Sequence, residues 1–216
     1  MPTPDDSKPF DIEVREFPQE RARRTYEGLL ASATKVFAER GFDATQTPDI
    51  AAAAGVSVGT FYRYFSDKRE VFLEVLRKEL ADSYKHVMGG LTAEHLLGKE
   101  RRATIEATMQ VLFDNLLRQP KMQRLFVEMA LRDEQVAELS RKFDRAAQKR
   151  IAELIAAICP PEQVADPEAT AYVVHTAVVE CANHIAGSHG ELPVSRERSL
   201  AALTDLVYRA LFGFDD

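Results

Sequence analysis

Apolar residues recur every three or four positions along most of this chain, and no segment shows the strict alternation of a half-buried β-strand. The first such stripe is Leu29, Ala33, Val36 and Phe37, in a helix that we expect to begin at Glu20. A long helix is predicted from Ser66 or Asp67 to Gly89, and further helices are predicted around 105–116, 125–129, 136–158, 168–187 and 200–214. The fold class predicted is therefore all-α, with a small N-terminal unit and a larger C-terminal helical domain. Because residues 168–187 are apolar almost all round, we expect that helix to be buried on more than one side.

Composition limits the cellular compartments and the classes of partner that this chain can have. The 216 residues carry 28 Lys and Arg against 34 Asp and Glu, a net charge of −6, which disfavours a protein whose whole surface binds nucleic acid. The two cysteines, Cys159 and Cys181, form no CxxC pair, so we expect neither a disulfide framework nor a cysteine-rich zinc site. No signal-peptide run and no stretch of eighteen apolar residues occurs. These features predict a cytoplasmic protein with no membrane partner.

The most informative segment is residues 47–68, TPDIAAAAGVSVGTFYRYFSDK. Thr47 precedes Pro48 and is predicted to cap a short helix, and Ser57 is predicted to cap a second one. Gly55 lies in the tight turn between them, where a left-handed backbone would suit glycine. Two short helices joined by such a turn are typical of a helix-turn-helix, whose second helix enters the major groove of DNA.

A helical wheel over residues 57–65 separates packing from recognition. Phe61 and Phe65 fall on the buried side with Ile50 and Val56, whereas Gly59, Thr60 and Arg63 face outward. Arginine can pair bidentately with guanine, a threonine methyl can contact a thymine methyl, and hydroxyl or ammonium groups can donate to phosphate. The predicted DNA-contacting residues are Thr47, Ser57, Val58, Gly59, Thr60, Tyr62, Arg63, Tyr64 and Lys68. The alternative is a purely structural helical pair that contacts no nucleic acid.

These residues resemble a known family. The chain shows Phe-Ala-x-x-Gly-Phe-x-x-Thr at residues 37–45, followed by DIAxxAGVSxGTFYxYFxxK at residues 49–68. This pattern is similar to the N-terminal domain of the TetR/AcrR family of transcriptional regulators, and the likeness is dense from about Arg21 to Leu76. The resemblance implies a homodimeric repressor that binds a near-palindromic operator and is released by a small ligand in the C-terminal domain. It also implies that the last two long helices pair with their copies in the dimer.

The resemblance and the motif divide the chain into three segments. Residues 1–19 are predicted to form a mobile acidic arm, residues 20–66 the helix-turn-helix DNA-binding domain, and residues 67–216 a regulatory and dimerisation domain. Residues 1–19 carry five acids and two bases, residues 20–70 carry eight bases and seven acids, and the remainder carries 18 bases and 22 acids. The DNA-binding segment is thus the one of the three that is not acidic, and Arg21, Arg23 and Arg24 cluster at its start.

The C-terminal domain yields two sets of candidate residues. A ligand pocket for a small hydrophobic or amphipathic effector is predicted to be lined by Met109, Phe113, Phe126, Met129, Leu139, Phe143, Val174, His175 and Val178, because Met and Phe suit adaptable apolar pockets. A dimer interface is predicted at Val179, Ala182, Ala186, Leu200, Leu203, Val207, Ala210 and Phe214. The polar residues His175, Thr176, Glu180, Asn183 and His184 interrupt an apolar helix, and either the ligand or the dimer interface would give them partners.

Other classes of protein receive little support. No GxSxG, P-loop, HExxH or dinucleotide-binding glycine pattern occurs, so we predict neither an enzyme nor a cofactor. A metal site from His175, Cys181, His184 and His189 lacks ligand-motif spacing beyond one pair, and no metal is predicted. The alternative functions are a helical protein-interaction module and a family member that does not repress and has no small-molecule ligand.

Overall fold

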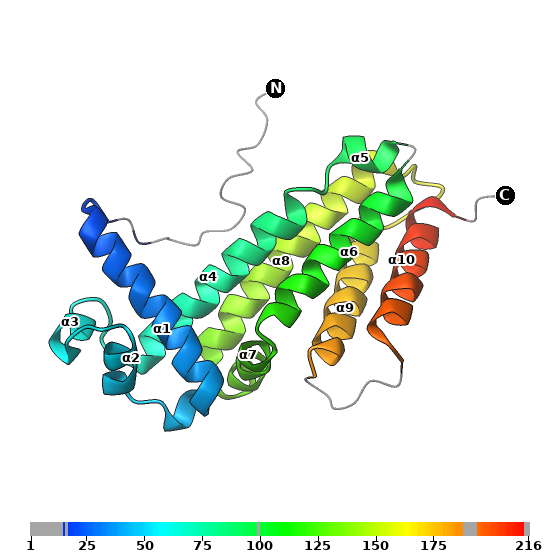
Figure 1. Cartoon of the computed structure of the whole chain (residues 1–216). Coiled ribbons are helices and arrows are strands. Elements are labelled where there is room, and N and C mark those ends of the chain that lie inside the picture. The colour runs from blue at the N-terminus through cyan, green and yellow to red at the C-terminus, as the bar shows by residue number, and fades with distance from the viewer. Residues whose placement is uncertain (1–14, 16, 99, 188–193, 214–216) are drawn as a thin grey trace. The chain divides into compact units, whose positions relative to one another are not determined.

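The computed structural model describes residues 15, 17–98, 100–187 and 194–213. In this part of the chain every regular element is a helix, which confirms the all-α prediction (Figure 1). The helices are α1 (Glu20–Ala44), α2 (Thr47–Ala53), α3 (Val58–Tyr62), α4 (Lys68–Met88), α5 (Ala93–Leu97), α6 (Arg101–Arg118), α7 (Pro120–Arg132), α8 (Glu134–Ile158), α9 (Pro167–Ile185) and α10 (Arg196–Phe212). Helix α5, a short helix capped by the Thr92 hydroxyl, was not predicted from the sequence.

Contacts divide the chain into two compact units. The first contains residues 1–81 and 124–140, and the second contains residues 82–123 and 141–216. Helices α4 and α8 therefore begin in the first unit and end in the second. The domain boundary predicted between residues 66 and 67 lies inside the first unit. The predicted division into domains stays a prediction.

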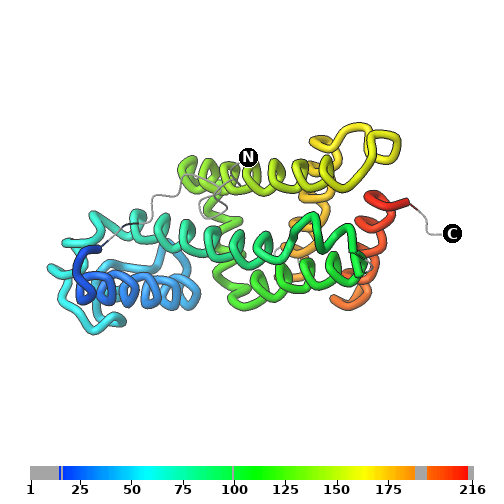
Figure 2. The backbone as a smooth tube through the Cα atoms, turned by 90° about the horizontal axis from the view of Figure 1, so that it is seen from above, coloured from blue at the N-terminus to red at the C-terminus, as the bar shows by residue number. Residues whose placement is uncertain are grey.

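The core of the first unit is aromatic. The predicted stripe of α1 is buried, with Leu29 and Ala33 fully inaccessible, and Phe37 packs edge-on against Phe72 of α4 at 5.2 Å between ring centroids. Figure 2 shows α1 and the start of α4 lying side by side. Phe126 of α7 adds its ring to Phe72 at 5.5 Å. A residue more than fifty positions later in the chain thus completes the core under the helix-turn-helix.

The corner between α7 and α8 is fastened to the same unit by ion pairs. Asp133 accepts hydrogen bonds from the Arg69 guanidinium, one of them 2.7 Å long, and these bonds hold the pKa of the Asp133 carboxyl below its usual value. Arg132 donates to both carboxylate oxygens of Asp43, at 2.9 and 3.0 Å. The Arg69 contact is two-pronged, from Nε and Nη2 to the two carboxylate oxygens, a geometry that planar guanidinium groups favour, whereas Arg132 bonds Asp43 through Nη2 alone. The pairs tie the start of α4 and the end of α1 to residues 132–133.

The second unit is built on α6, α9 and α10, which pack against one another. Phe113 of α6, Ala171 of α9 and Leu203 of α10 belong to its buried core. Contrary to the sequence expectation, α9 is not buried all round: Tyr172 and Val173 are 58% and 62% exposed. Its opposite face is buried, so in a single chain α9 leaves an outer face in solvent on which these two large side chains stand beside polar ones such as Thr176 and Glu180. Among the described residues, no helix has both the length and the hydropathy needed to cross a bilayer.

Candidate nucleic-acid interface and cavity

The turn between α2 and α3 has the geometry expected from its sequence. Gly55 adopts a left-handed φ of 66°, which glycine allows without a Cβ clash. The Val56 N–H then donates to the Ala51 carbonyl at 3.0 Å. Ser57 caps α3 by accepting a 3.0 Å hydrogen bond from the Thr60 N–H, as predicted. The two helices are therefore held by backbone hydrogen bonds at a glycine turn.

The start of α2 differs from the prediction by one residue. The N-cap is Gln46 rather than Thr47, and it exchanges hydrogen bonds with Asp49 in a capping box. Arg40 of α1 pairs with the same Asp49 at 2.9 Å. Thr47 is therefore the first residue of the helix, and its hydroxyl is not needed for the cap. Its half-buried side chain lies at a helix N-terminus, where backbone N–H groups favour anions.

Helix α3 has two distinct faces, as the wheel predicted. Phe61 is fully buried and Phe65, just beyond the helix, is 1% exposed. Ser57, Val58, Gly59, Tyr62 and Arg63 are exposed, and Thr60 is half-buried. Tyr62 is 55% exposed, although tyrosine side chains are usually at least partly buried. The Arg63 side chain makes no hydrogen bond or ion pair with any residue that the structure describes.

Gly59 is the one glycine inside this helix, and the fold does not demand it. A Cβ placed there would meet only the Ser57 hydroxyl, at 3.8 Å, and the backbone has an ordinary negative φ. Glycine in a helix nonetheless costs about 1 kcal/mol relative to alanine. The packing of the chain on itself therefore gives no reason for the missing side chain, which leaves the outer surface of α3 flat at this point.

Tyr64 is packed more closely than the sequence suggested. Its ring lies 5.9 Å from that of Phe17 and 6.4 Å from that of Tyr26, and its carbonyl accepts a hydrogen bond from the Arg15 guanidinium. Arg15 also pairs with Glu70 at the start of α4. Two residues of the predicted arm, Arg15 and Phe17, thus contact Tyr64 just after α3. Residues 1–14 and 16 of the arm lie outside the described residues. The phosphate contact predicted for the Tyr64 hydroxyl stays a prediction.

Lys68 has a structural role that the sequence did not reveal. Its ammonium donates to the carbonyls of Phe42, Asp43 and Thr45 at 2.9, 3.0 and 2.9 Å, and it lies 4.8 Å from the centre of the Phe42 ring. A lysine has three N–H donors, so all of them are engaged. A phosphate contact would require one of these bonds to be given up. We therefore assign Lys68 the role of holding the end of α1 and the first residue after it, and its phosphate contact stays a prediction.

The positive charge at the start of α1 is smaller than the sequence count implies. Arg23 pairs with Glu20 and Glu27, and Arg24 pairs with Glu20. Of the three arginines, Arg21 alone has a side chain without a hydrogen bond or ion pair to a described residue. This surface therefore offers one unengaged cation rather than three.

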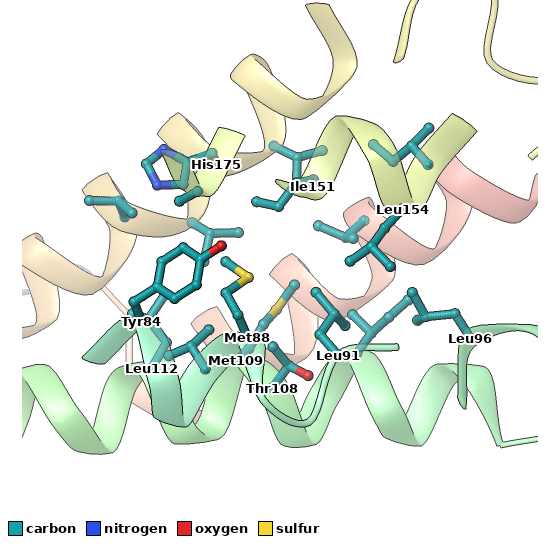
Figure 3. Close-up of a pocket in the computed structure, with 18 of the residues that line it drawn as sticks. Tyr84, Met88, Leu91, Leu96, Thr108, Met109, Leu112, Ile151, Leu154 and His175 are labelled. Carbon is teal, nitrogen blue, oxygen red and sulfur yellow. The ribbon is translucent and has the colours of Figure 1, made fainter. Parts of the chain in front are cut away.

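The second unit encloses a cavity of about 120 Å³. Its wall comes from the end of α4, the loop after it, α5, α6, the later part of α8, α9 and α10 (Figure 3). The lining residues are Ser83, Tyr84, Val87, Met88, Leu91, Leu96, Ile105, Thr108, Met109, Leu112, Phe143, Ala147, Ile151, Leu154, Ile155, Ile158, Val174, His175, Val178, Val179, Val207 and Leu211. The wall is apolar apart from a few hydroxyls and one imidazole, which suits a small apolar ligand.

Comparison with known proteins decides the family. The model of bacterial regulatory proteins of the tetR family matches residues 29–75, and that of the tetracyclin repressor-like C-terminal domain matches residues 102–211. The second match alone covers half of the chain, and together the two cover both the helix-turn-helix and the unit with the cavity.

This chain belongs to the TetR family of transcriptional regulators.

Individual relatives match over shorter or more distant stretches. The transcriptional repressor KstR2 of Rhodococcus jostii is 36% identical over 89 residues, 40% of this chain and 40% of that protein. The transcriptional activator FasR of Mycolicibacterium smegmatis is 30% identical over 100 residues, 46% of this chain and 44% of that protein. The chain thus spans less than half the length of these two curated relatives.

Solved structures resemble the chain over most of its length. A TetR-family regulator from Mesorhizobium loti superposes with a TM-score of 0.68 at 23% identity, covering 88% of this chain and 98% of that one. SmeT, the repressor of the Stenotrophomonas maltophilia multidrug efflux pump SmeDEF, has a TM-score of 0.65 at 23% identity, covering 88% and 92%. At this level of identity, the likeness shows the TetR fold alone.

The TetR-family cavity contains part of the predicted lining. Met109, Phe143, Val174, His175 and Val178 line it, and the other four predicted residues do not. Phe113 points into the core between α6, α9 and α10. Phe126, Met129 and Leu139 belong to the first unit, where Phe126 packs on Phe72. The lining residues of α4, Tyr84 and Met88 among them, were not predicted from the sequence.

The predicted dimer residues of this TetR-family chain stay a prediction, and most of them are buried within the single chain. Ala182, Ala186, Leu200, Leu203 and Val207 are each 8% exposed or less within a single chain, so they have little surface left for a partner. Val179 and Val207 line the cavity. Ala210 is exposed, and Phe214 lies outside the described residues. The three–four periodicity therefore identified the inner stripe, the residues of α9 and α10 that are buried within the single chain, rather than the residues on their outer faces.

The polar residues of α9 also separate. Asn183 is buried, and its carbonyl oxygen accepts a 3.1 Å hydrogen bond from the Gln123 amide of the same unit. Thr176, Glu180 and His184 are exposed on the outer face. His175 is 7% exposed and lines the cavity. Of these five polar residues, His175 alone lines the cavity, and whether the exposed ones face a dimer partner stays a prediction.

His175 is an uncharged polar group. Burial lowers its pKa to about 4, so the imidazole is neutral near pH 7. The Gln148 amide nitrogen lies 3.4 Å from its Nδ1, and the Asp144 carboxyl lies 3.8 Å from its Nε2. Burial raises the pKa of Asp144 to about 6. Within the described part of the chain no three metal-ligating side chains cluster, and His189 of the metal alternative lies outside it.

Proposed function

We propose that this TetR-family chain is a homodimeric repressor that binds a near-palindromic operator through α3 and releases it when a small, mostly apolar effector enters the cavity. The observation that carries the proposal is the outer face of α3, where an exposed, unpaired Arg63 follows a glycine that the fold does not need. Side chains that the fold does not use, on a helix held by the hydrogen bonds of its turn, are available to contact the edges of DNA bases.

The roles proposed on this surface follow from chemistry. Arg63 is proposed to read a guanine, and Thr60 to contact a thymine methyl. Gly59 is proposed to let the α3 backbone approach the bases. Tyr62, Ser57, Val58 and Thr47 are proposed to contact the DNA backbone beside it. The unengaged Arg21 at the start of α1 is a further candidate for a phosphate contact.

The dimer is proposed to form through the outer faces of α9 and α10. Tyr172, Val173 and Leu206 are 58%, 62% and 57% exposed in the single chain, although large apolar side chains are usually buried. They replace the buried residues of the inner stripe as the proposed contacts, with Ala210 retained. Pairing the faces of two chains would cover these side chains, and a dimer that binds an inverted repeat must present its two copies of α3 to successive major grooves, about 34–36 Å apart.

Operator binding is the first test. The purified chain should bind a duplex from around its own gene that contains a short inverted repeat, about 1,000-fold more tightly than random duplex at moderate salt. Fluorescence polarisation against salt concentration measures both the affinity and the number of phosphate contacts. Binding that does not discriminate between the two duplexes would favour a protein-interaction module. Because relatives include both a repressor and an activator, a reporter assay determines the direction of regulation.

The dimer face has its own test. Val173→Glu and Leu206→Glu each place a charge in the proposed interface and should weaken the dimer at least about tenfold, because a buried unpaired carboxylate is costly. Analytical ultracentrifugation measures the effect. Leu131→Glu is the matched control, since Leu131 of α7 is 87% exposed and lies outside the proposed face. A dimer unaffected by both α9 and α10 variants would contradict the assignment.

A further inference from the structure

The wall of the cavity contains no formal charge. Among the described residues that line it, none is Lys, Arg, Asp or Glu. The lining residues with polar side chains are Ser83, Tyr84, Thr108 and His175. An ion moved from water into such a space loses its hydration and finds no opposite charge, which is far more costly than burying a neutral hydroxyl with a hydrogen-bond partner.

The polar groups differ in what they can offer. The Thr108 hydroxyl already donates to the Thr104 carbonyl of its own helix at 2.8 Å. The Gln148 amide nitrogen is a donor, so the Nδ1 atom of His175 that faces it must accept, and the ring proton is on Nε2. On that side the nearest charged group is the Asp144 carboxyl, at 3.8 Å. A carboxylate would repel a ligand anion placed beside His175.

Two of the polar groups, Tyr84 and His175, lie at the same end of the cavity, whereas Thr108 lies nearer to Leu91. Figure 3 shows the Tyr84 hydroxyl directed into the cavity on the same side as His175, with Leu91, Leu96 and Leu154 at the opposite end. The chain order is consistent with this arrangement, because α4 carries Tyr84 first and Met88 last, and Leu91 follows in the loop. Tyr84 and His175 thus make one end of the cavity the more polar one.

We propose that the effector is an uncharged molecule with an apolar body and one hydrogen-bonding group, which lies between the Tyr84 hydroxyl and the His175 imidazole. This inference rests on the proposed function and narrows it to a chemical class. A free carboxylate is disfavoured by the uncharged wall and by the Asp144 carboxyl beside His175, and an ammonium is disfavoured by the uncharged wall because Asp144 itself does not line the cavity. The cavity volume of about 120 Å³ is close to that of engineered cavities that hold a benzene ring, so small aromatic probes match it in size.

Four probes that share one ring separate charge from shape: toluene, benzyl alcohol, benzoate and benzylammonium. Binding to the full chain is followed by the methyl NMR signals of ¹³C-labelled methionine. Met88 and Met109 line the cavity, whereas Met122 and Met129 are buried elsewhere and serve as internal controls. Toluene and benzyl alcohol should shift the first pair alone. Benzoate and benzylammonium should bind at least about tenfold more weakly than benzyl alcohol, because each ion would be buried without a partner.

Tyr84→Phe tests the position of the polar group. Loss of the hydroxyl should weaken benzyl alcohol about tenfold and leave toluene unchanged, since only the alcohol uses the hydrogen bond. Tyr208→Phe is the matched control, because the Tyr208 hydroxyl accepts from Arg101 in the same unit and does not line the cavity. It should change neither affinity.

Each other outcome overturns the inference. These outcomes are benzoate or benzylammonium binding as tightly as the alcohol, Tyr84→Phe weakening toluene and the alcohol equally, and no shift of Met88 and Met109 by either neutral probe. Operator binding is measured separately on the same samples. If benzyl alcohol enters the cavity as described but leaves the operator bound, the ligand class stands and the proposed release mechanism fails.

Discussion

Replacing Arg63 by alanine should abolish most of the sequence preference of the chain while leaving its fold intact. Arg63 is exposed and its side chain makes no hydrogen bond or ion pair with a described residue, so the free energy of unfolding should change by less than about 0.5 kcal/mol. A bidentate arginine–guanine contact contributes about 1–3 kcal/mol of discrimination, which corresponds to roughly 5- to 150-fold in affinity for each half-site. Competition binding against operators substituted at one base pair measures the loss.

Arg63→Lys is the decisive control for that result. Lysine keeps the positive charge but not the planar, two-pronged donor, so the salt dependence should persist while base preference falls nearly as far as in the alanine variant. If lysine restores full discrimination, Arg63 acts as a phosphate contact rather than a base reader. If both variants bind every sequence as the parent does, α3 is not the reading helix.

Replacing Lys68 by methionine should destabilise the DNA-binding unit strongly. Methionine keeps the aliphatic stem but removes the donor from three carbonyls that meet the ammonium at 2.9–3.0 Å. Hydrogen bonds to a charged group contribute about 1.5–3 kcal/mol each, and partial solvent access reduces the sum, so we expect a loss of about 2–3 kcal/mol. Chemical denaturation gives the free energy of unfolding.

The control and the DNA measurement separate the two roles considered for Lys68. Lys35→Met removes another lysine of the same unit, exposed on α1 and unbonded to described residues, and should change stability by less than about 0.5 kcal/mol. A Lys68→Met chain of unchanged stability, with a salt slope flatter by about one, would instead support the phosphate contact that the sequence suggested.

The sequence predicted well what one helix determines by itself. Phe61 and Phe65 repeat at four-residue spacing, so their burial and the exposure of Arg63 follow from the helical period alone. Glycine readily adopts the left-handed backbone of the turn at Gly55, and the hydroxyl of Ser57 is a good N-cap acceptor. These features are local, and the helix-turn-helix could therefore be predicted from residues 47–68.

Features that depend on packing between distant segments were not predictable. The three acceptors of Lys68 come from a segment more than twenty residues earlier, and Asp133 meets Arg69 from 64 residues away. In α9 apolar residues occur on both faces, so periodicity could not show that Val179 faces the cavity while Val173 faces solvent. The capping box at Gln46 was overlooked because Thr47, a better N-cap residue, stands beside it.

The corner between α7 and α8 limits how this protein can be cut and recombined. The first unit takes Phe126, Arg132 and Asp133 into its core and its ion pairs, so a fragment that ends after α4 lacks part of its own scaffold. A ribosome must therefore deliver about two thirds of the chain before the helix-turn-helix has all of its contacts. A chimera that joins this DNA-binding head to another sensor needs to carry residues 124–140 with it.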